Sequence, residues 1–235
     1  MSKISWIIFT VVIVGVFGLL LFFSNNQESS AKLNVDEIDT ASIQLGNESN
    51  GNISDHIYGN KDSKVTLIEY ADYQCPGCGT SHDYIKTIVE EYKDQIQYVY
   101  RNFLLEYHNN ARAAASAAEA SGLQEKFWEM HHRVFDSQKE WELLTGQKRT
   151  DKFISYAKEL NLDIDKFLSD MSSKEISMKL DYDYALGKKA DLDATPSFYL
   201  NGKKLEYEIW SDNKKLRNAL NTELEKAGIS LPDNT

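Results

Sequence analysis

The feature that most constrains this chain is the tetrapeptide Cys75-Pro76-Gly77-Cys78, which contains the only two cysteines among its 235 residues. The apolar and β-branched stretch from 65 to 70 comes before it and is typical of a buried strand. Apolar residues then recur at helical spacing from 84 to 92, which predicts an amphipathic helix. Cys75 is therefore expected at the start of a helix, where free backbone N–H groups and the helix dipole favour a thiolate.

Three interpretations of the two cysteines compete. A structural zinc site needs four ligands, and without a second cysteine pair it would have to recruit distant groups such as His82 on the same helix. The residues His108, His131 and His132 fall in ordinary helical segments, and the sequence predicts no metal site. An inert disulfide would close a very short loop and stabilise little, because the entropic gain of a crosslink grows with loop length. A redox-active pair is the favoured interpretation.

Three segments precede the globular part of the chain. Residues 1–5 are predicted to be a cytoplasmic N-terminus and residues 6–23 a transmembrane anchor, since this uncharged run approaches the roughly 20 apolar residues that cross a bilayer. Lys3 lies before the run and no basic residue follows until Lys32, which favours an N-terminus in the cytoplasm. A signal sequence, retained or cleaved, is the alternative. Residues 24–55 are rich in Ser, Asn, Asp, Glu and Gly and are predicted to be a mobile polar tether.

Residues 56–235 form one predicted α/β domain. A second strand is expected at 95–100, and a helix between two strands of one sheet predicts a parallel, right-handed βαβ unit. A long stretch of about 104–190 shows only helical patterns and is predicted to be a helical insertion. Strand character returns at 197–200 and is followed by Asn201-Gly202, a strong hairpin signal, and then by a last amphipathic helix.

The charge balance excludes one class of partner. The chain has 26 Lys and Arg against 36 Asp and Glu, a formal net charge of −10. A basic surface of the kind that binds nucleic acid is therefore absent from the composition.

A second notable motif is Thr195-Pro196, directly before the strand at 197–200. Its plainest interpretation is a proline at the first residue of a strand, which need not donate a hydrogen bond to the sheet. The residues alone leave a functional cis-proline as the alternative.

The order of elements and three motifs together resemble the DsbA-like branch of the thioredoxin superfamily over about residues 56–226. The motifs are the segment from Glu69 to Cys78 (EYADYQCPGC), the segment from Phe127 to His131 (FWEMH) and Thr195-Pro196. The resemblance implies a thioredoxin fold interrupted by helices, with Pro196 in the cis form opposite the cysteines. It also implies that the backbone of Thr195 pairs with the substrate chain.

Two positions depart from the pattern of that branch. Gly77 stands where strongly oxidising members carry a histidine, and Ala194 stands where many relatives have glycine. The first departure removes a positive partner of the thiolate, and the second makes the turn before Thr195 less permissive. Both departures bear on the direction of electron flow.

The predicted chemistry assigns a role to each site residue. Cys75, nearer to solvent, attacks and forms the mixed disulfide, and Cys78, one turn further along the helix, resolves it. Glu69 lies on the buried strand, and the resemblance implies that it shuttles protons for Cys78. The alternative is that strand alternation turns Glu69 to solvent. Thr195 and Pro196 are predicted to bind substrate, and no cofactor besides the Cys75–Cys78 disulfide is expected.

The predicted function is that of an extracytoplasmic thiol-disulfide oxidoreductase that introduces disulfides into secreted or surface proteins. Membrane anchorage with the domain outside the cytoplasm favours oxidation, because disulfides persist there. The expected partners are unfolded proteins with cysteines, a membrane redox partner that reoxidises the pair, and the membrane itself, and the protein is expected to be a monomer. The alternatives are a disulfide isomerase or reductase, and a non-catalytic chaperone or binding module.

Overall fold

The computed structural model describes residue 35 and residues 37–233, and a five-stranded mixed sheet forms the centre of this unit. The strand order is β1-β3-β2-β4-β5. Parallel β2 and β3 lie at its centre, β1 pairs antiparallel with β3, and β4 pairs antiparallel with β2 and β5. The bounds are β1 His56–Gly59, β2 Thr66–Ala71, β3 Gln97–Asn102, β4 Ser197–Leu200 and β5 Lys203–Lys204.

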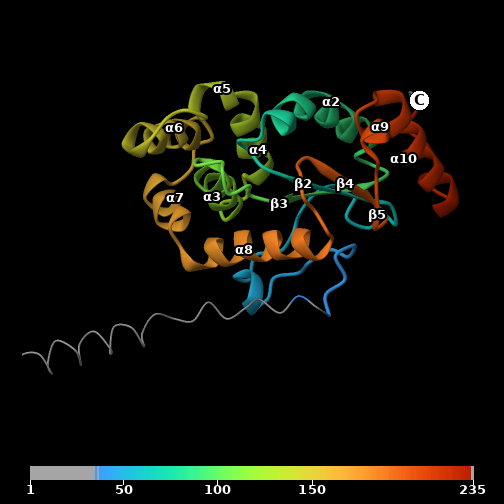
Figure 1. Ribbon diagram of the computed structural model, residues 1–235, viewed down its shortest axis with the longest axis horizontal. Helices are drawn as coiled ribbons and strands as arrows, with labels where there is room; N and C mark the ends of the chain where they lie inside the picture. Colours follow the sequence, from blue (N-terminus) through green and yellow to red (C-terminus); the bar gives the residue numbers. More distant parts are fainter. Residues whose placement is uncertain (1–34, 36, 234–235) are drawn as a thin grey trace, which may run out of the picture. The chain divides into compact units, whose positions relative to one another are not determined.

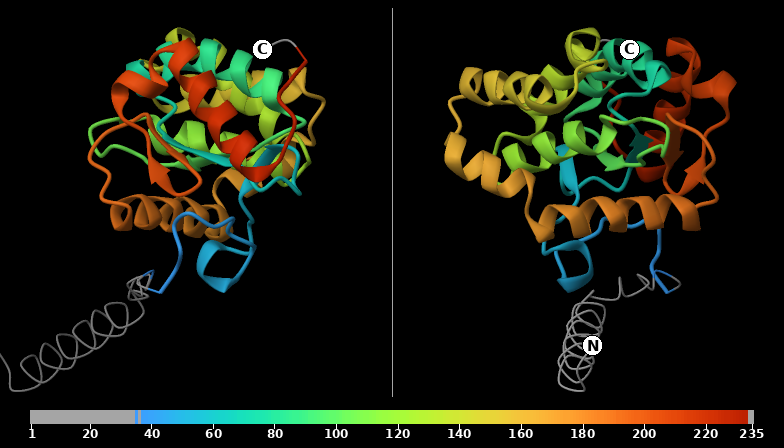
Figure 2. Two further views of the ribbon diagram at one scale, coloured as in Figure 1. Left: turned by 90° about the vertical axis from the view of Figure 1, so that its right-hand side faces the viewer. Right: turned by 60° about the vertical axis from the view of Figure 1, so that its left-hand side comes forward.

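The helices cover the two faces of this sheet unequally. On one face, α2 (Pro76–Tyr92) and α10 (Asn213–Ala227) lie side by side and share one apolar core with β2 and β4 (Figure 2). The helix α8 (Lys174–Lys189) lies on the opposite side of the sheet from α2, as Figure 1 shows. Since successive residues of a strand point to opposite faces, neighbouring residues of β2 and β3 meet different surroundings.

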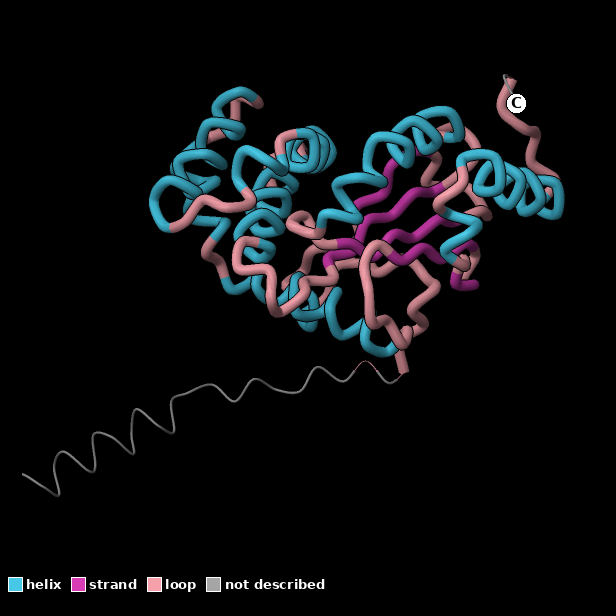
Figure 3. The backbone as a smooth tube through the Cα atoms, turned by 45° about the horizontal axis from the view of Figure 1, so that its top comes forward, coloured by secondary structure: helices cyan, strands magenta, loops and turns pink. Residues whose placement is uncertain are grey.

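The remaining helices form the predicted insertion between β3 and β4. They gather beside the sheet around a second apolar core that is rich in alanine and aromatic residues (Figure 3). The helices of the insertion are α3 Ala111–Gly122, α4 Phe127–Asp136, α5 Gln138–Trp141, α6 Gly146–Glu159, α7 Ile164–Met171 and α8. The small alanine side chains of α3, the first helix of the insertion, allow α4 and α7 to approach it closely. A short helix, α9 (Tyr207–Trp210), follows β5 and precedes α10. The prediction of an α/β thioredoxin-type fold with a helical insertion is confirmed.

The segment before β1 differs from its prediction. Residues 24–55 are predicted to be a mobile tether, yet the described part of this segment belongs to the compact unit, and Gln44, Asn50 and Asp55 are buried in it. A short 3₁₀ helix, η1 (Glu48–Asn50), lies next to α8 and is capped by the side chain of Asn47. The polar side chains that resemble a linker in the sequence cap turns and pair with buried charges. The tether prediction is therefore wrong for residues 37–55.

The predicted membrane location also needs correction. None of the helices in the described part of the chain combines the length and the apolar character needed to cross a membrane. The prediction of a single-pass cell-membrane protein is corrected to this extent: no helix of the described residues provides the membrane span. The predicted N-terminus (1–5) and anchor (6–23) lie outside the described residues.

Candidate active site at the start of α2

The two cysteines occupy the first turn of α2. Cys75 is the N-cap residue, with an extended backbone, and Pro76 follows at the first helical position. Proline suits this position because its missing N–H would have no partner in the helix. Both cysteines are free thiols, with Cys75 7% exposed and Cys78 1% exposed. As the sequence predicts, the first thiol is nearer to solvent than the second.

The surroundings move the pKa values of the two thiols in opposite directions. The hydrogen bond with the Cys78 side chain lowers the pKa of Cys75 to about 5, against the effect of burial and with help from Thr195 and the backbone N–H groups of Gly77 and Cys78. Burial raises the pKa of Cys78 well above its usual value, and its hydrogen bond with Cys75 raises it further. Cys75 is therefore stabilised as a thiolate, whereas Cys78 holds its proton.

The Thr195–Pro196 loop lies against Cys75. The peptide bond between Thr195 and Pro196 is cis, as the resemblance implies. The Cys75 thiol donates a hydrogen bond to the carbonyl oxygen of Thr195 at 3.4 Å. A Cβ atom added to Gly77 would lie 3.6 Å from Cδ of Pro196 and 3.7 Å from Sγ of Cys75. The fold thus brings Cys75 and Gly77 together with Thr195 and Pro196, about 120 positions further along the chain.

Glu69 is buried on the same side of the sheet as Cys78. Its side chain is 4% exposed and accepts a hydrogen bond from the hydroxyl of Tyr98 on β3. Burial raises the pKa of Glu69 to about 7, which the hydrogen bond from Tyr98 only partly offsets. A negative charge on Glu69 would in turn raise the pKa of Cys78, so the two groups interact. The alternative of a solvent-facing Glu69 is wrong.

Two residues at this site are not identified by sequence reasoning. The amide of Gln138, on α5 of the insertion, donates to the carbonyl oxygens of Tyr73 at 2.7 Å and Cys75 at 2.9 Å, and so holds the loop that carries Cys75. No sequence signal connects Gln138 with this loop. Tyr98 could have been found, because it lies on the predicted second strand and strand alternation places it on one of two faces.

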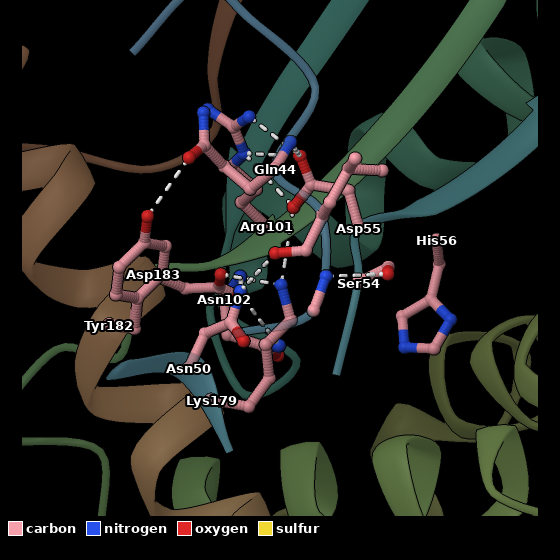
Figure 4. Close-up of polar contacts among 12 residues, drawn as sticks. Gln44, Asn50, Ser54, Asp55, His56, Arg101, Asn102, Lys179, Tyr182 and Asp183 are labelled. Carbon is pink, nitrogen blue, oxygen red and sulfur yellow. Dashed lines mark hydrogen bonds and ion pairs between the residues drawn. The ribbon is translucent and has the colours of Figure 1, made fainter. Parts of the chain in front are cut away.

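The opposite face of the sheet carries a buried ionic network, drawn in Figure 4. Asp55 contacts Nη2 of Arg101 at 2.7 Å and Nζ of Lys179 at 3.2 Å, and Lys179 also contacts Asp183 at 2.8 Å. Burial alone would raise the pKa of Asp55, but the charges of Lys179 and Arg101 outweigh burial and lower this pKa to about 2. Arg101 also donates to the hydroxyl of Tyr70 at 2.8 Å. These charges are fully paired.

Comparison with known proteins adds to this description. A family model described as thioredoxin matches residues 51–221. Over 151 residues the chain is 32% identical to the Na(+)/H(+) antiporter NhaA 1 of Salinispora arenicola. The matched region covers 64% of this chain and 22% of that protein. The chain thus spans less than a quarter of that relative's length.

Solved structures resemble this one over most of their length. BdbD of Bacillus subtilis, in its oxidised form, has a TM-score of 0.64 at 21% identity, covering 78% of this chain and 98% of that chain. The alpha-DsbA1 protein of Wolbachia pipientis has a TM-score of 0.61 at 25% identity, covering 74% of this chain and 92% of that chain. The predicted resemblance to DsbA-like thiol-disulfide oxidoreductases is confirmed.

Proposed function

This chain belongs to the thioredoxin family, and on that premise we propose that it is a thiol-disulfide oxidoreductase that oxidises the cysteines of other protein chains. The observation that carries the proposal is the opposite displacement of two neighbouring thiol pKa values. The pKa of the Cys75 thiol is lowered to about 5, whereas burial raises the pKa of the Cys78 thiol. A low-pKa thiol leaves a mixed disulfide readily, so the equilibrium favours the reduced enzyme and the oxidised substrate.

The oxidation proceeds in two exchange steps. A substrate thiolate attacks Sγ of Cys75 in the Cys75–Cys78 disulfide, a mixed disulfide forms, and Cys78 leaves and takes up a proton. A second substrate thiolate then attacks the substrate sulfur of the mixed disulfide, which releases Cys75 as a thiolate. The substrate loses two electrons and gains a disulfide, and the enzyme gains both electrons as two reduced sulfurs.

Glu69 supplies the proton that Cys78 needs in the first step. Cys78 is a poor leaving group without a proton, because burial raises its pKa. Glu69 carries a proton near neutral pH, since its own pKa is about 7. In the reverse direction the carboxylate takes the proton back and allows Cys78 to attack. Tyr98, which donates to Glu69, also lines a cavity of about 470 Å³, and this cavity offers the proton a route to water.

The substrate chain lies along the Thr195–Pro196 loop. When Cys75 carries its proton, the carbonyl oxygen of Thr195 accepts the hydrogen bond of the thiol. An extended substrate segment that pairs with the backbone of Thr195 would bring its own cysteine beside Cys75. Unfolded chains suit this mode, because their backbone groups are free to pair. A separate redox partner must accept two electrons from the reduced pair in each cycle.

The decisive measurement is the reduction potential of the Cys75–Cys78 pair, by equilibration with glutathione. A potential above about −180 mV, the value of a disulfide isomerase, would support an oxidase. A potential near about −270 mV, the value of thioredoxin, would overturn it and favour a reductase.

Two variants separate exchange chemistry from mere binding. Cys75→Ser should abolish exchange in both directions. Cys78→Ser, mixed with a disulfide that joins two peptides, should release one peptide and accumulate the mixed disulfide of Cys75 with the other, since Cys78 is not present to attack it. If Cys75→Ser retained full activity on unfolded proteins, the protein would act as a binding module instead.

A further inference from the structure

Three histidines from two helices face one another beside the cavity on the α2 side of the sheet. His82 lies on α2, one turn beyond Cys78, and His131 and His132 lie on α4. One ring nitrogen of each lies within 4.8 Å of those of the other two. His82 and His131 are buried, and His132 is partly exposed. Among the described residues this cluster has no part in the thiol chemistry proposed above.

The spacing of these nitrogens fits a tetrahedral metal ion. Zinc binds imidazole nitrogen at roughly 2.0–2.1 Å, which places two ligands of a tetrahedral site about 3.4 Å apart. Nδ1 of His132 and Nε2 of His82 are separated by 3.4 Å. The third nitrogen, on His131, lies within 4.8 Å of the other two, so metal binding would draw it inward by at most about 1.4 Å.

The surroundings hold the rings in place. Nδ1 of His131 lies 3.0 Å from the hydroxyl of Tyr73, which leaves Nε2 of this ring for a metal. Metal-binding histidines commonly use their second nitrogen for such a hydrogen bond, because it fixes the tautomer and the ring orientation. The ring of His82 stacks on Phe135 with a centroid distance of 4.6 Å.

The charged side chains near the cluster balance one another. Asp136 approaches Nε2 of His82 at 3.5 Å and also pairs with Lys86 at 3.4 Å. Glu90 lines the same cavity, and Glu129 acts electrostatically on His132. Each of these two glutamates has its own lysine partner on the surface. Three carboxylates are therefore matched by three lysines, so the affinity for a divalent cation would depend on the histidines.

The cavity supplies what three protein ligands leave open. It has a volume of about 470 Å³, is lined by all three histidines and is partly open to solvent. A water molecule in it could occupy a fourth position, as in zinc sites that have three protein ligands.

We propose that His82, His131 and His132 bind one divalent transition-metal ion of the zinc type, with water from the cavity as the fourth ligand. Imidazole is a preferred ligand of zinc, copper and nickel and a poor one for magnesium and calcium. The ion would join α2, which carries the cysteines, to α4 of the insertion. The site does not depend on the proposed redox function, because no cysteine belongs to it.

The test is a zinc titration of the tag-free, fully oxidised chain by isothermal titration calorimetry. Oxidation prevents Cys75 and Cys78 from acting as thiolate ligands. We expect one zinc ion per chain, and calcium at the same concentration should not compete. His132→Gln should weaken zinc binding by at least the roughly 10–100-fold that loss of a mere orienting partner costs. This variant should fold, since His132 is only partly buried.

A matched histidine elsewhere provides the control. His108 pairs with Asp72 at 2.9 Å and is not one of the three cluster residues, so His108→Gln should bind zinc as tightly as the natural chain. Zinc should also raise the melting temperature of the oxidised natural chain and of His108→Gln, but not that of His132→Gln.

X-ray absorption identifies the ligands directly. Nitrogen and oxygen neighbours at roughly 2.0–2.1 Å, without sulfur at about 2.3 Å, would support the site. Absence of stoichiometric binding, equal affinity in His132→Gln, or a zinc–sulfur distance would overturn it.

Discussion

The two faces of the central sheet treat buried charge in opposite ways. On the α8 face, Asp55 meets Arg101 and Lys179, and its pKa is lowered to about 2. On the α2 face, the hydroxyl of Tyr98 is the one polar partner of Glu69 among the described residues, and the pKa of Glu69 is raised to about 7. The two environments are separated by one residue along β2, since Glu69 points toward one face and Tyr70, which accepts from Arg101, toward the other.

The difference teaches that burial does not decide what a carboxyl group does. Both groups lose water, and this loss alone would raise both pKa values. The nearby cations reverse the shift for Asp55 and make its carboxylate a structural tie between the N-terminal segment, β3 and α8. Without a cation, Glu69 stays close to its titration point at neutral pH and is available for proton transfer.

The largest expected effect comes from removing one charge of the ionic network on the α8 face. Asp55→Asn should destabilise the protein by about 3–5 kcal/mol at pH 7, because it leaves Arg101 and Lys179 buried with one carboxylate fewer. Urea unfolding measures the loss. Since the pKa of Asp55 is lowered from 3.8 to about 2, its contribution is present above about pH 4 and is lost as the pH falls toward 2.

An exposed aspartate is the matched control for that variant. Asp181 pairs with Arg112 on the surface, where both side chains are about half exposed. Asp181→Asn should cost at most about 1 kcal/mol. Equal losses in the two variants would contradict the distinction between a buried network and a surface pair.

On the α2 face, where Glu69 lies, stability should depend on pH in the opposite sense. The pKa of Glu69 is raised from 4.5 to about 7, so the folded state binds the proton more tightly and loses stability as the pH rises through this window. Glu69→Gln removes this penalty and should gain about 3 kcal/mol at pH 8 relative to pH 4, at roughly 1.4 kcal/mol per pKa unit. Urea unfolding at the two pH values measures the gain, and a difference independent of pH would contradict the raised pKa.

The same variant should slow the chemistry. Glu69→Gln can no longer carry a proton to or from Cys78, so resolution of a mixed disulfide should slow about 100-fold, at the lower end of general acid–base effects. Stopped-flow release of a peptide from its mixed disulfide with Cys75 measures this step at pH 7. An unchanged rate would remove Glu69 from the mechanism while leaving the roles of both cysteines intact.

The smallest expected effect sharpens the role of Tyr98. Its hydrogen bond lowers the pKa of Glu69, so Tyr98→Phe should move the midpoint of the pH-dependent stability change upward by about one pH unit, as loss of a single charge-assisted bond predicts. The control is Tyr58→Phe, which removes a hydroxyl bonded to Glu90 on the surface. A midpoint that moves equally in both variants would show that the hydroxyl of Tyr98 does not act on Glu69.

The redox motif and the order of β2, α2, β3, the helical insertion, β4 and the last helix could be predicted because they depend on local patterns, whereas the edge strand β1 was not predicted. Helical spacing identifies α2 and α10, and Pro76 marks the start of α2. By contrast, the described residues before Asp55 are predicted to be a tether, because composition does not show that Asp55 will meet Lys179, 124 positions away.

The chain's sequence by itself determined that two cysteines stand at the start of a helix after a buried strand, and that an α/β domain surrounds them. These features arise from periodicity, capping and proline geometry over a few neighbouring residues. Only the tertiary structure decided that Glu69 has no cationic partner among the described residues, that Asp55 has two, and that His82 meets a histidine 50 positions away. The physical reason is that a buried group takes its properties from its partners in space, which packing selects from distant parts of the chain.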